Sequence, residues 1–246
     1  QLTTELFGLL APARADIAVD IALLPIRTTA ILDAQWISQF YVAMHALASR
    51  VDSSISLKRQ TQWLAEQAKG QLPTDSSAAK IYEFVKNQYL NNPDKDDWES
   101  TRDAVYQRYQ LSAMDGYTYH QPFDAGINFA ASLVSLFYGE GDIKRTVQIG
   151  TLAGWDSDNP TATWGGLLGF MLGKQGVETA FNQTNLSNTY SIHRTRRNFP
   201  DQSPNELGED TFANMAARDL RTIDRVVVEL MQGTVNTETN RWIIPL

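Results

Sequence analysis

Apolar side chains recur at steps of three and four residues along most of this chain, a spacing that restricts it to folds built from packed helices. The clearest case is the segment 33–48, whose apolar residues share one helical face and where Asp33 is placed to act as the cap. Caps and breakers predict a helix that ends at Pro25 and others over about 57–69, 77–90, 98–112, 127–138, 143–152, 161–173 and 209–232. With no confident strand and no fixed repeat, we expect one all-α multi-helix bundle over residues 1–246.

Charge and composition exclude several classes of protein. The chain has 246 residues, 43% of them hydrophobic, so it can bury a large core, and disorder is not expected. A net charge of −7 argues against a nucleic-acid binder. The basic cluster at 193–197 is interpreted as a solvated loop, with phosphate binding as the alternative. No apolar run approaches the roughly 20 residues of a membrane span.

The chain contains no cysteine, which rules out disulfides and thiol chemistry but is neutral about the compartment. Two consecutive triplets for asparagine-linked glycosylation begin at Asn182 and Asn185 in a polar segment, and they favour secretion of a glycoprotein. A cytoplasmic location with an unmodified loop is the alternative. Because the chain begins with Gln1 rather than Met, we expect a processed or truncated product.

The segment 154–160, Gly-Trp-Asp-Ser-Asp-Asn-Pro, is the strongest candidate for chemistry. Asp156 and Asp158 stand one residue apart between an apolar segment and a helix start, where their side chains can converge. Carboxylate oxygens of this kind suit Mg²⁺, Mn²⁺ or Ca²⁺, and Asn159 offers a third oxygen unless it caps the helix that Pro160 begins. An EF-hand loop is disfavoured by its spacing, and a plain capped turn is the structural alternative.

Other candidate residues have structural explanations beside the functional ones. His45 lies in the helix at 33–48 and is interpreted as a hydrogen-bonded packing residue. His120 and Asp124 are the titratable residues of an aromatic, polar loop between helices, where ligand contacts are common, although structural roles are the alternative. Three glycines in the following helix share one face at a spacing of four, which predicts the close approach of another backbone: Gly165, Gly169 and Gly173.

The segment 154–159 resembles the carboxy-terminal signature of the ADP-ribosylglycohydrolase family, usually written Gly-Gly-Asp-Thr-Asp-Thr. That family includes dinitrogenase reductase-activating glycohydrolase and the J1-crystallin-like proteins. The segments 5–12 and 40–47 resemble segments that the family carries in its middle, and the last helix is similar too. The resemblance therefore extends over nearly the whole chain, in the same order of segments.

This resemblance implies a compact all-α bundle that holds two divalent cations, Mg²⁺ or Mn²⁺, and hydrolyses the glycosidic bond at the anomeric carbon of ribose. Asp156 and Asp158 match the two metal-binding aspartates of the signature, and Asn159 takes the place of its ligating threonine. Trp155 replaces the second glycine, where it either forms an aromatic wall for a base or a sugar or fills the core. We assign Trp155, His120 and Asp124 as substrate-binding residues.

One part of the family pattern is missing from this chain. The family carries its other metal ligands in a Thr-Asp-Asp triplet near its amino terminus, together with the acidic residue often assigned as catalytic base. This sequence contains no Thr-Asp-Asp, and its catalytic residue is unidentified. We therefore expect the chain to be the carboxy-terminal portion of a larger, here incomplete bundle, partnered by an amino-terminal segment or chain of the same protein.

Two functional hypotheses follow. The leading one is a metal-dependent hydrolase of a glycosidic bond in ADP-ribose conjugates or a related sugar substrate, with no nucleic-acid or membrane partner. The alternative is a catalytically inactive, crystallin-like or binding protein of the same fold, which the replacement at Asn159 motivates.

Overall fold

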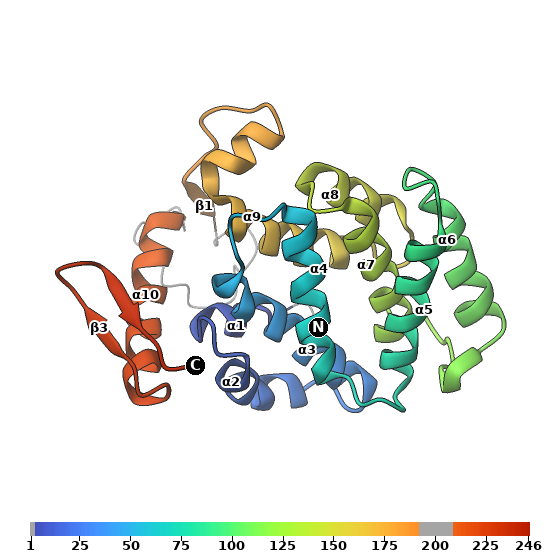
Figure 1. Ribbon diagram of the computed structural model, residues 1–246, viewed down its shortest axis with the longest axis horizontal. Helices are drawn as coiled ribbons and strands as arrows, with labels where there is room; N and C mark the ends of the chain where they lie inside the picture. Colours follow the sequence, from blue (N-terminus) through green and yellow to red (C-terminus); the bar gives the residue numbers. More distant parts are fainter. Residues whose placement is uncertain (1–2, 192–208) are drawn as a thin grey trace. The chain divides into compact units, whose positions relative to one another are not determined.

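The structure, a computed structural model, describes residues 3–191 and 209–246. Within these ranges it contains ten α-helices and four strands of three residues each, which confirms the all-α prediction (Figure 1). The chain divides into two compact units, Gln1–Phe181 and Asn182–Leu246. A single domain over residues 1–246 stays a prediction.

Over the residues described, the larger unit is built from helices joined by loops and contains no strand. Its helices, in chain order, are α1 (Leu6–Leu10), α2 (Ala15–Arg27), α3 (Asp33–Leu47), α4 (Leu57–Ala68), α5 (Ser77–Asn91), α6 (Glu99–Val105), α7 (Ala125–Gly139), α8 (Ile143–Leu152) and α9 (Asp158–Ala180). Three 3-10 turns extend or join them: η1 (Ala48–Arg50), η2 (Lys69–Gln71) and η4 (Met114–Gly116). Helix α6 continues directly into a π-helix, η3 (Tyr106–Leu111).

Helix α7 is the central element of this unit. It contacts α3, α5, α6, α8 and α9, and every residue of α7 after Ala125 is buried (Figure 1). Edge-to-face aromatic contacts fill the space around it, with the Phe40 and Phe129 ring centroids 5.2 Å apart and those of Tyr41 and Trp164 5.4 Å apart. Such pairs add about 0.5–1.5 kcal/mol each to the hydrophobic gain of burial.

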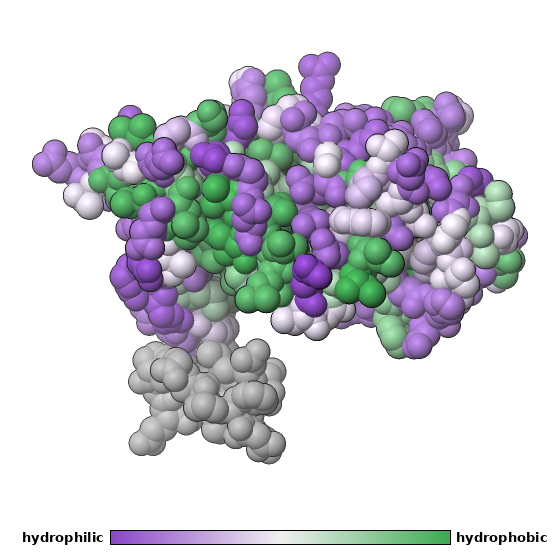
Figure 2. Space-filling view, turned by 90° about the horizontal axis from the view of Figure 1, so that it is seen from below, coloured by the Kyte–Doolittle hydropathy of each residue, from purple (hydrophilic) through white to green (hydrophobic). Residues whose placement is uncertain are grey.

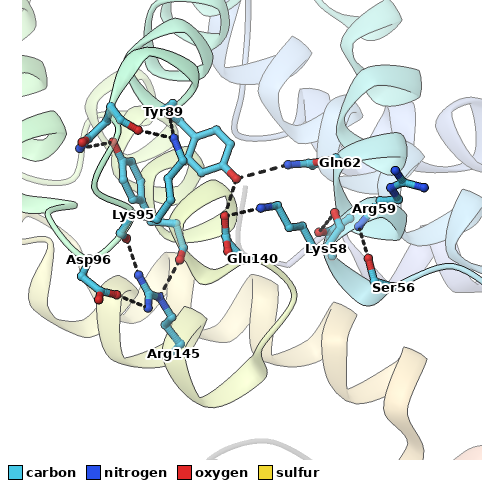
Figure 3. Close-up of polar contacts among 12 residues, drawn as sticks. Ser56, Lys58, Arg59, Gln62, Tyr89, Lys95, Asp96, Glu140 and Arg145 are labelled. Carbon is cyan, nitrogen blue, oxygen red and sulfur yellow. Dashed lines mark hydrogen bonds and ion pairs between the residues drawn. The ribbon is translucent and has the colours of Figure 1, made fainter.

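Polar contacts hold the carboxyl end of α7 against α4, α5 and α8 (Figure 3). Glu140 follows α7 and accepts hydrogen bonds from Lys58 Nζ at 2.7 Å and from the Tyr89 hydroxyl at 2.6 Å. Arg145 of α8 donates to the Tyr138 carbonyl at 2.8 Å and to Asp96 Oδ1 at 2.6 Å. Asp96 belongs to the acidic run 94–97, which precedes α6, and its side chain is exposed.

Three local predictions were wrong. Pro25 lies inside α2, which continues to Arg27 before it ends. Asp33 does not cap its own helix, because its carboxylate accepts the Ala78 backbone N–H at the start of α5, at 2.8 Å. The glycines of α9 face no close backbone: a Cβ at Gly165 or Gly169 would meet only a valine methyl at 3.9 Å, and Gly173, with φ +67°, interrupts the helix.

The smaller unit combines one long helix with two hairpin-like strand pairs. Strand β1 (Thr189–Ser191) pairs antiparallel with β2 (Glu209–Thr211), and β3 (Thr234–Asn236) pairs antiparallel with β4 (Arg241–Ile243). Helix α10 (Phe212–Glu229) follows β2 and is capped by Thr211, so the predicted last helix begins three residues later than expected. The Trp242 indole donates to Asp224 of α10 at 2.8 Å, which ties the second strand pair to the helix.

The surface mixes hydrophilic and hydrophobic areas on the face seen from below (Figure 2). In the ranges that the structure covers, no helix combines the length and the apolar character that crossing a membrane requires. Asn182 and Asn185 are both exposed, and their glycosylation stays a prediction. The basic cluster 193–197, interpreted as a solvated loop, lies outside the described residues.

The packing interpretation of His45 is confirmed and gives a testable pH dependence. His45 is 4% exposed, and its Nδ1 lies 2.8 Å from the Tyr41 carbonyl oxygen. Burial lowers the pKa of His45 from 6.5 to about 4. The unfolded chain therefore binds this proton more tightly than the folded one, and stability is lost as the pH falls from about 6.5 towards about 4.

We expect His45 to contribute a loss of about 2 kcal/mol in the free energy of unfolding between pH 8 and pH 5. Urea denaturation at both pH values checks this, with His45→Gln as the comparison. The variant should lose less stability between the two pH values than the wild type does. Equal losses in both proteins would show that His45 is not held neutral.

Candidate metal centre and adjoining cleft

The motif lies in the short loop between α8 and α9, and its backbone is unusual. Gly154 has φ +101° and Trp155 has φ +53°, so two successive residues are left-handed. That conformation costs a bulky residue about 1–3 kcal/mol and persists only where the surroundings enforce it. The Trp155 indole donates to Gln110 Oε1 at 2.7 Å, and the Asp156 backbone N–H donates to Asn128 Oδ1 at 3.0 Å.

Asp156 and Asp158 interact in the structure, and their role as metal ligands stays a prediction. Burial first, and then the neighbouring Asp158 carboxylate, raise the pKa of Asp156 above its usual value. Asp158 is the first residue of α9, where the helix dipole favours a negative charge. Two carboxylates this close repel each other, and a cation between them would relieve that repulsion.

Asn159 follows Asp158 in the chain and is buried, at 5% exposure. It does not cap α9, which begins one residue earlier, and its Oδ1 atom has no hydrogen-bond partner among the residues described. Buried polar atoms are nearly always paired, so an orphaned acceptor indicates a missing donor or cation. Asp156, Asp158 and Asn159 are all oxygen donors and suit a hard divalent cation.

A further carboxyl group near the motif was missed from the sequence. Glu5 precedes α1, and its Oε1 accepts the Thr163 hydroxyl at 2.8 Å, one turn of α9 after Asn159. Burial raises the pKa of Glu5. The adjacent Thr4 is buried, and its hydroxyl has no partner within the described chain. In the sequence, Glu5 is a lone acidic residue before an apolar run, and no pattern around it predicts its contact with Thr163.

Asn128 was also missed, although a polar residue inside the strongly apolar helix α7 is a signal that such a residue must be paired. Its Nδ2 donates to the carbonyls of Pro122 and Asp124 at 2.7 and 2.9 Å, while its Oδ1 accepts from Asp156. This one side chain joins the loop at 117–124 to the motif.

His120 and Asp124 lie in that loop. The Asp124 carboxylate accepts the backbone N–H groups of His120 and Gln121 at 2.6 and 3.1 Å, so it holds the loop in shape. The His120 residue is exposed. These contacts are the ones expected if Asp124 has a structural role. Substrate binding by His120 or Asp124 stays a prediction.

An open cleft of about 500 Å³ adjoins the motif. It is lined by one side of α6 and the π-helix η3, by the aromatic loop, and by the motif itself. The cleft lining includes the side chains of Arg102, Asp103, Tyr106, Gln110, Tyr119 and Trp155. Trp155 both lines this cleft and packs partly against the hydrophobic core, and its contact with a base or a sugar stays a prediction.

The donor set fits one side of a divalent-cation site. Across the ranges described, no three His, Asp or Glu side chains are grouped closely enough to hold a metal on their own. The convergent pair Asp156–Asp158 and the unpartnered Asn159 oxygen nevertheless have the chemistry that Mg²⁺ or Mn²⁺ prefers.

Comparison with known proteins identifies the class. The ADP-ribosylglycohydrolase family matches residues 3–207, most of the chain, and the chain therefore belongs to that family. Membership suggests hydrolysis of a glycosidic bond, and the family is generally dependent on divalent cations. No curated protein and no solved structure matches the chain.

We expect Asn128→Ala to destabilise the protein by about 2–4 kcal/mol, because it removes three partly buried hydrogen bonds and leaves their partners unpaired. Asn87→Ala is the matched control, since Asn87 is exposed on α5 and its removal should change stability by less than about 0.5 kcal/mol. Chemical denaturation measures both. Equal effects of the two substitutions would contradict the role given to Asn128.

Proposed function

We propose that this protein is a metal-dependent hydrolase that cleaves the glycosidic bond of an ADP-ribose conjugate or a related sugar substrate. The observations that carry the proposal are the interaction of Asp156 with Asp158 and, next to Asp158 in the chain, the buried Asn159 oxygen, which has no partner among the residues described. Packing does not account for two carboxylates that raise each other's energy at the start of a helix. Membership of the ADP-ribosylglycohydrolase family supports the reaction class.

Each residue of the motif has a role in this proposal. Asp156 and Asp158 would hold the cation, with Asn159 Oδ1 as a neutral third donor. When bound, a divalent cation supplies electrostatic stabilisation and orients sugar hydroxyls next to the bond that breaks. Asn128 fixes the Asp156 backbone, and the Trp155 ring borders the substrate. Hydrolysis breaks the bond between the anomeric carbon and the leaving atom, adds the hydroxyl group of a water molecule to that carbon and transfers the water's other proton to the leaving atom.

Three protein oxygens are fewer than the six ligands of Mg²⁺. We propose that an amino-terminal segment or chain of the same protein supplies further ligands and the catalytic base. Mass spectrometry of the natural protein, searching for a co-purifying segment that contains Thr-Asp-Asp, tests this idea. Recovery of a fully active protein without such a segment would refute it.

The second candidate function is a binding protein of the same fold without activity, and the specific observation behind it is the amide at Asn159. An amide differs in reach and basicity from the hydroxyl that the family signature places there. Retained metal binding without turnover of any glycoside would favour this candidate, whereas turnover by the natural protein would exclude it.

We expect Asp156→Asn and Asp158→Asn each to weaken Mn²⁺ binding by at least about tenfold, because each removes a charged ligand. Isothermal titration calorimetry on the natural protein measures the affinity, and hydrolysis of ADP-ribosylated substrates and a glycoside panel measures activity. Both variants, and treatment of the wild type with EDTA, should abolish hydrolysis.

Asp75→Asn is the control for these two variants, because Asp75 is exposed and forms no ion pair or hydrogen bond with the residues that the structure describes. It should bind Mn²⁺ and turn over substrate as the wild type does. Mn²⁺ binding that survives both motif substitutions would refute the proposed metal site.

A further inference from the structure

The cleft beside the motif is built around a tryptophan that the backbone holds at a cost. Trp155 stands where the family signature has glycine, and its φ of +53° is the conformation for which glycine is normally required. Replacing Trp155 with glycine would relieve this strain. A bulky ring retained at such a position is characteristic of a functional site rather than of packing.

The Trp155 side chain lines the cleft. Its one polar atom, Nε1, is already satisfied by Gln110 Oε1 at 2.7 Å, so the ring has only its faces and edges left to offer a ligand. Gln110 lies on the π-helix η3, a rare conformation that is frequently found at functional sites. The Gln110 amide nitrogen remains able to donate a hydrogen bond.

Two tyrosines extend the aromatic lining. Tyr106 is 36% exposed and Tyr119 is partly buried, and neither hydroxyl has a hydrogen-bond partner in the part of the chain described. Together with Trp155 they surround the cleft with aromatic rings that come from three separate segments. Such walls suit a ring with an apolar face and a polar edge.

The charges around the cleft argue against an anionic ligand. The only basic side chain that lines it, among the residues described, is Arg102, whose Nε donates to Asp103 Oδ1 at 2.6 Å. This pair is nearly neutral, so the described lining offers a phosphate no unpaired cation. The remaining lining offers both donors and acceptors, which match hydroxyl groups because each hydroxyl donates and accepts.

We propose that this cleft is a subsite for an uncharged sugar ring, joined through the scissile bond to the group that the Asp156–Asp158 centre holds. The sugar's apolar face lies against Trp155 and Tyr106, and its hydroxyls bond to Gln110, Asp103 and the tyrosine hydroxyls. This inference rests on the proposed function, and it names the leaving group as a neutral sugar rather than a protein side chain or a phosphate-bearing group.

Saturation-transfer NMR on the full chain tests the subsite. The Asp156→Asn background prevents turnover, and the probes are maltose, cellobiose, lactose, trehalose, adenosine and ADP-ribose. We expect at least one disaccharide to bind, with about tenfold weaker affinity in Trp155→Gly and Tyr106→Ala and a change of less than about threefold in Tyr106→Phe, which keeps the ring. Trp155→Gly should fold, because glycine accepts the positive φ.

The proposal is overturned if none of the disaccharides binds, if their binding is the same in Trp155→Gly as in the parent, or if adenosine or ADP-ribose alone depends on Trp155 and Tyr106. Circular dichroism of every variant excludes loss of fold as the cause. If the wild-type protein binds no Mn²⁺ but a disaccharide binds through Trp155, the proposed function is refuted and the subsite stands. Metal-dependent hydrolysis by a protein that binds no disaccharide would support the proposed function and refute the subsite.

Discussion

Helix α7 is buried on nearly every side, so each polar side chain on it must find a partner inside the protein. Those partners are the neighbouring elements. Ser135 donates to the Thr146 carbonyl of α8 at 2.8 Å, the Ser132 carbonyl accepts the Trp164 indole of α9 at 2.7 Å, and Asn128 binds the Asp156 backbone. The two helices that flank the motif, and the motif itself, are therefore placed by the hydrogen-bonding needs of one central helix.

This placement explains how the chain tolerates an energetically poor loop at its candidate centre. A left-handed tryptophan, two mutually repelling carboxylates and an unpaired buried amide oxygen occur within five residues, 155–159. Each feature is unfavourable alone, and rigid supports on both sides, at Gln110 and Asn128, keep them together. Strain and unmet polar groups that cluster in this way are typical of binding and catalytic sites.

Much of the fold could be predicted because apolar spacing reports directly on helices: α3, α4, α7 and α8 lie where that spacing placed them. The aspartate pair was also predictable, since it stands at a loop-to-helix boundary. Contacts between distant segments were not. Nothing in the local sequence relates Glu5 to Thr163 or Gln110 to Trp155. The glycine spacing of α9 predicted a close backbone neighbour, and the structure places none there among the residues it describes. Asp33 shows the same limit, because its carboxylate serves a different helix from the one it begins.

The central claim is that Asp156, Asp158 and Asn159 ligate a divalent cation. Crystals of the natural protein grown with Mn²⁺ and measured for anomalous scattering test it most directly. The account predicts an anomalous peak within about 2–2.5 Å of oxygens from both aspartates, a distance typical of such ligands, with the Asn159 oxygen turned towards it. A well-ordered motif with no peak beside it, at Mn²⁺ concentrations that occupy other sites, would contradict the claim.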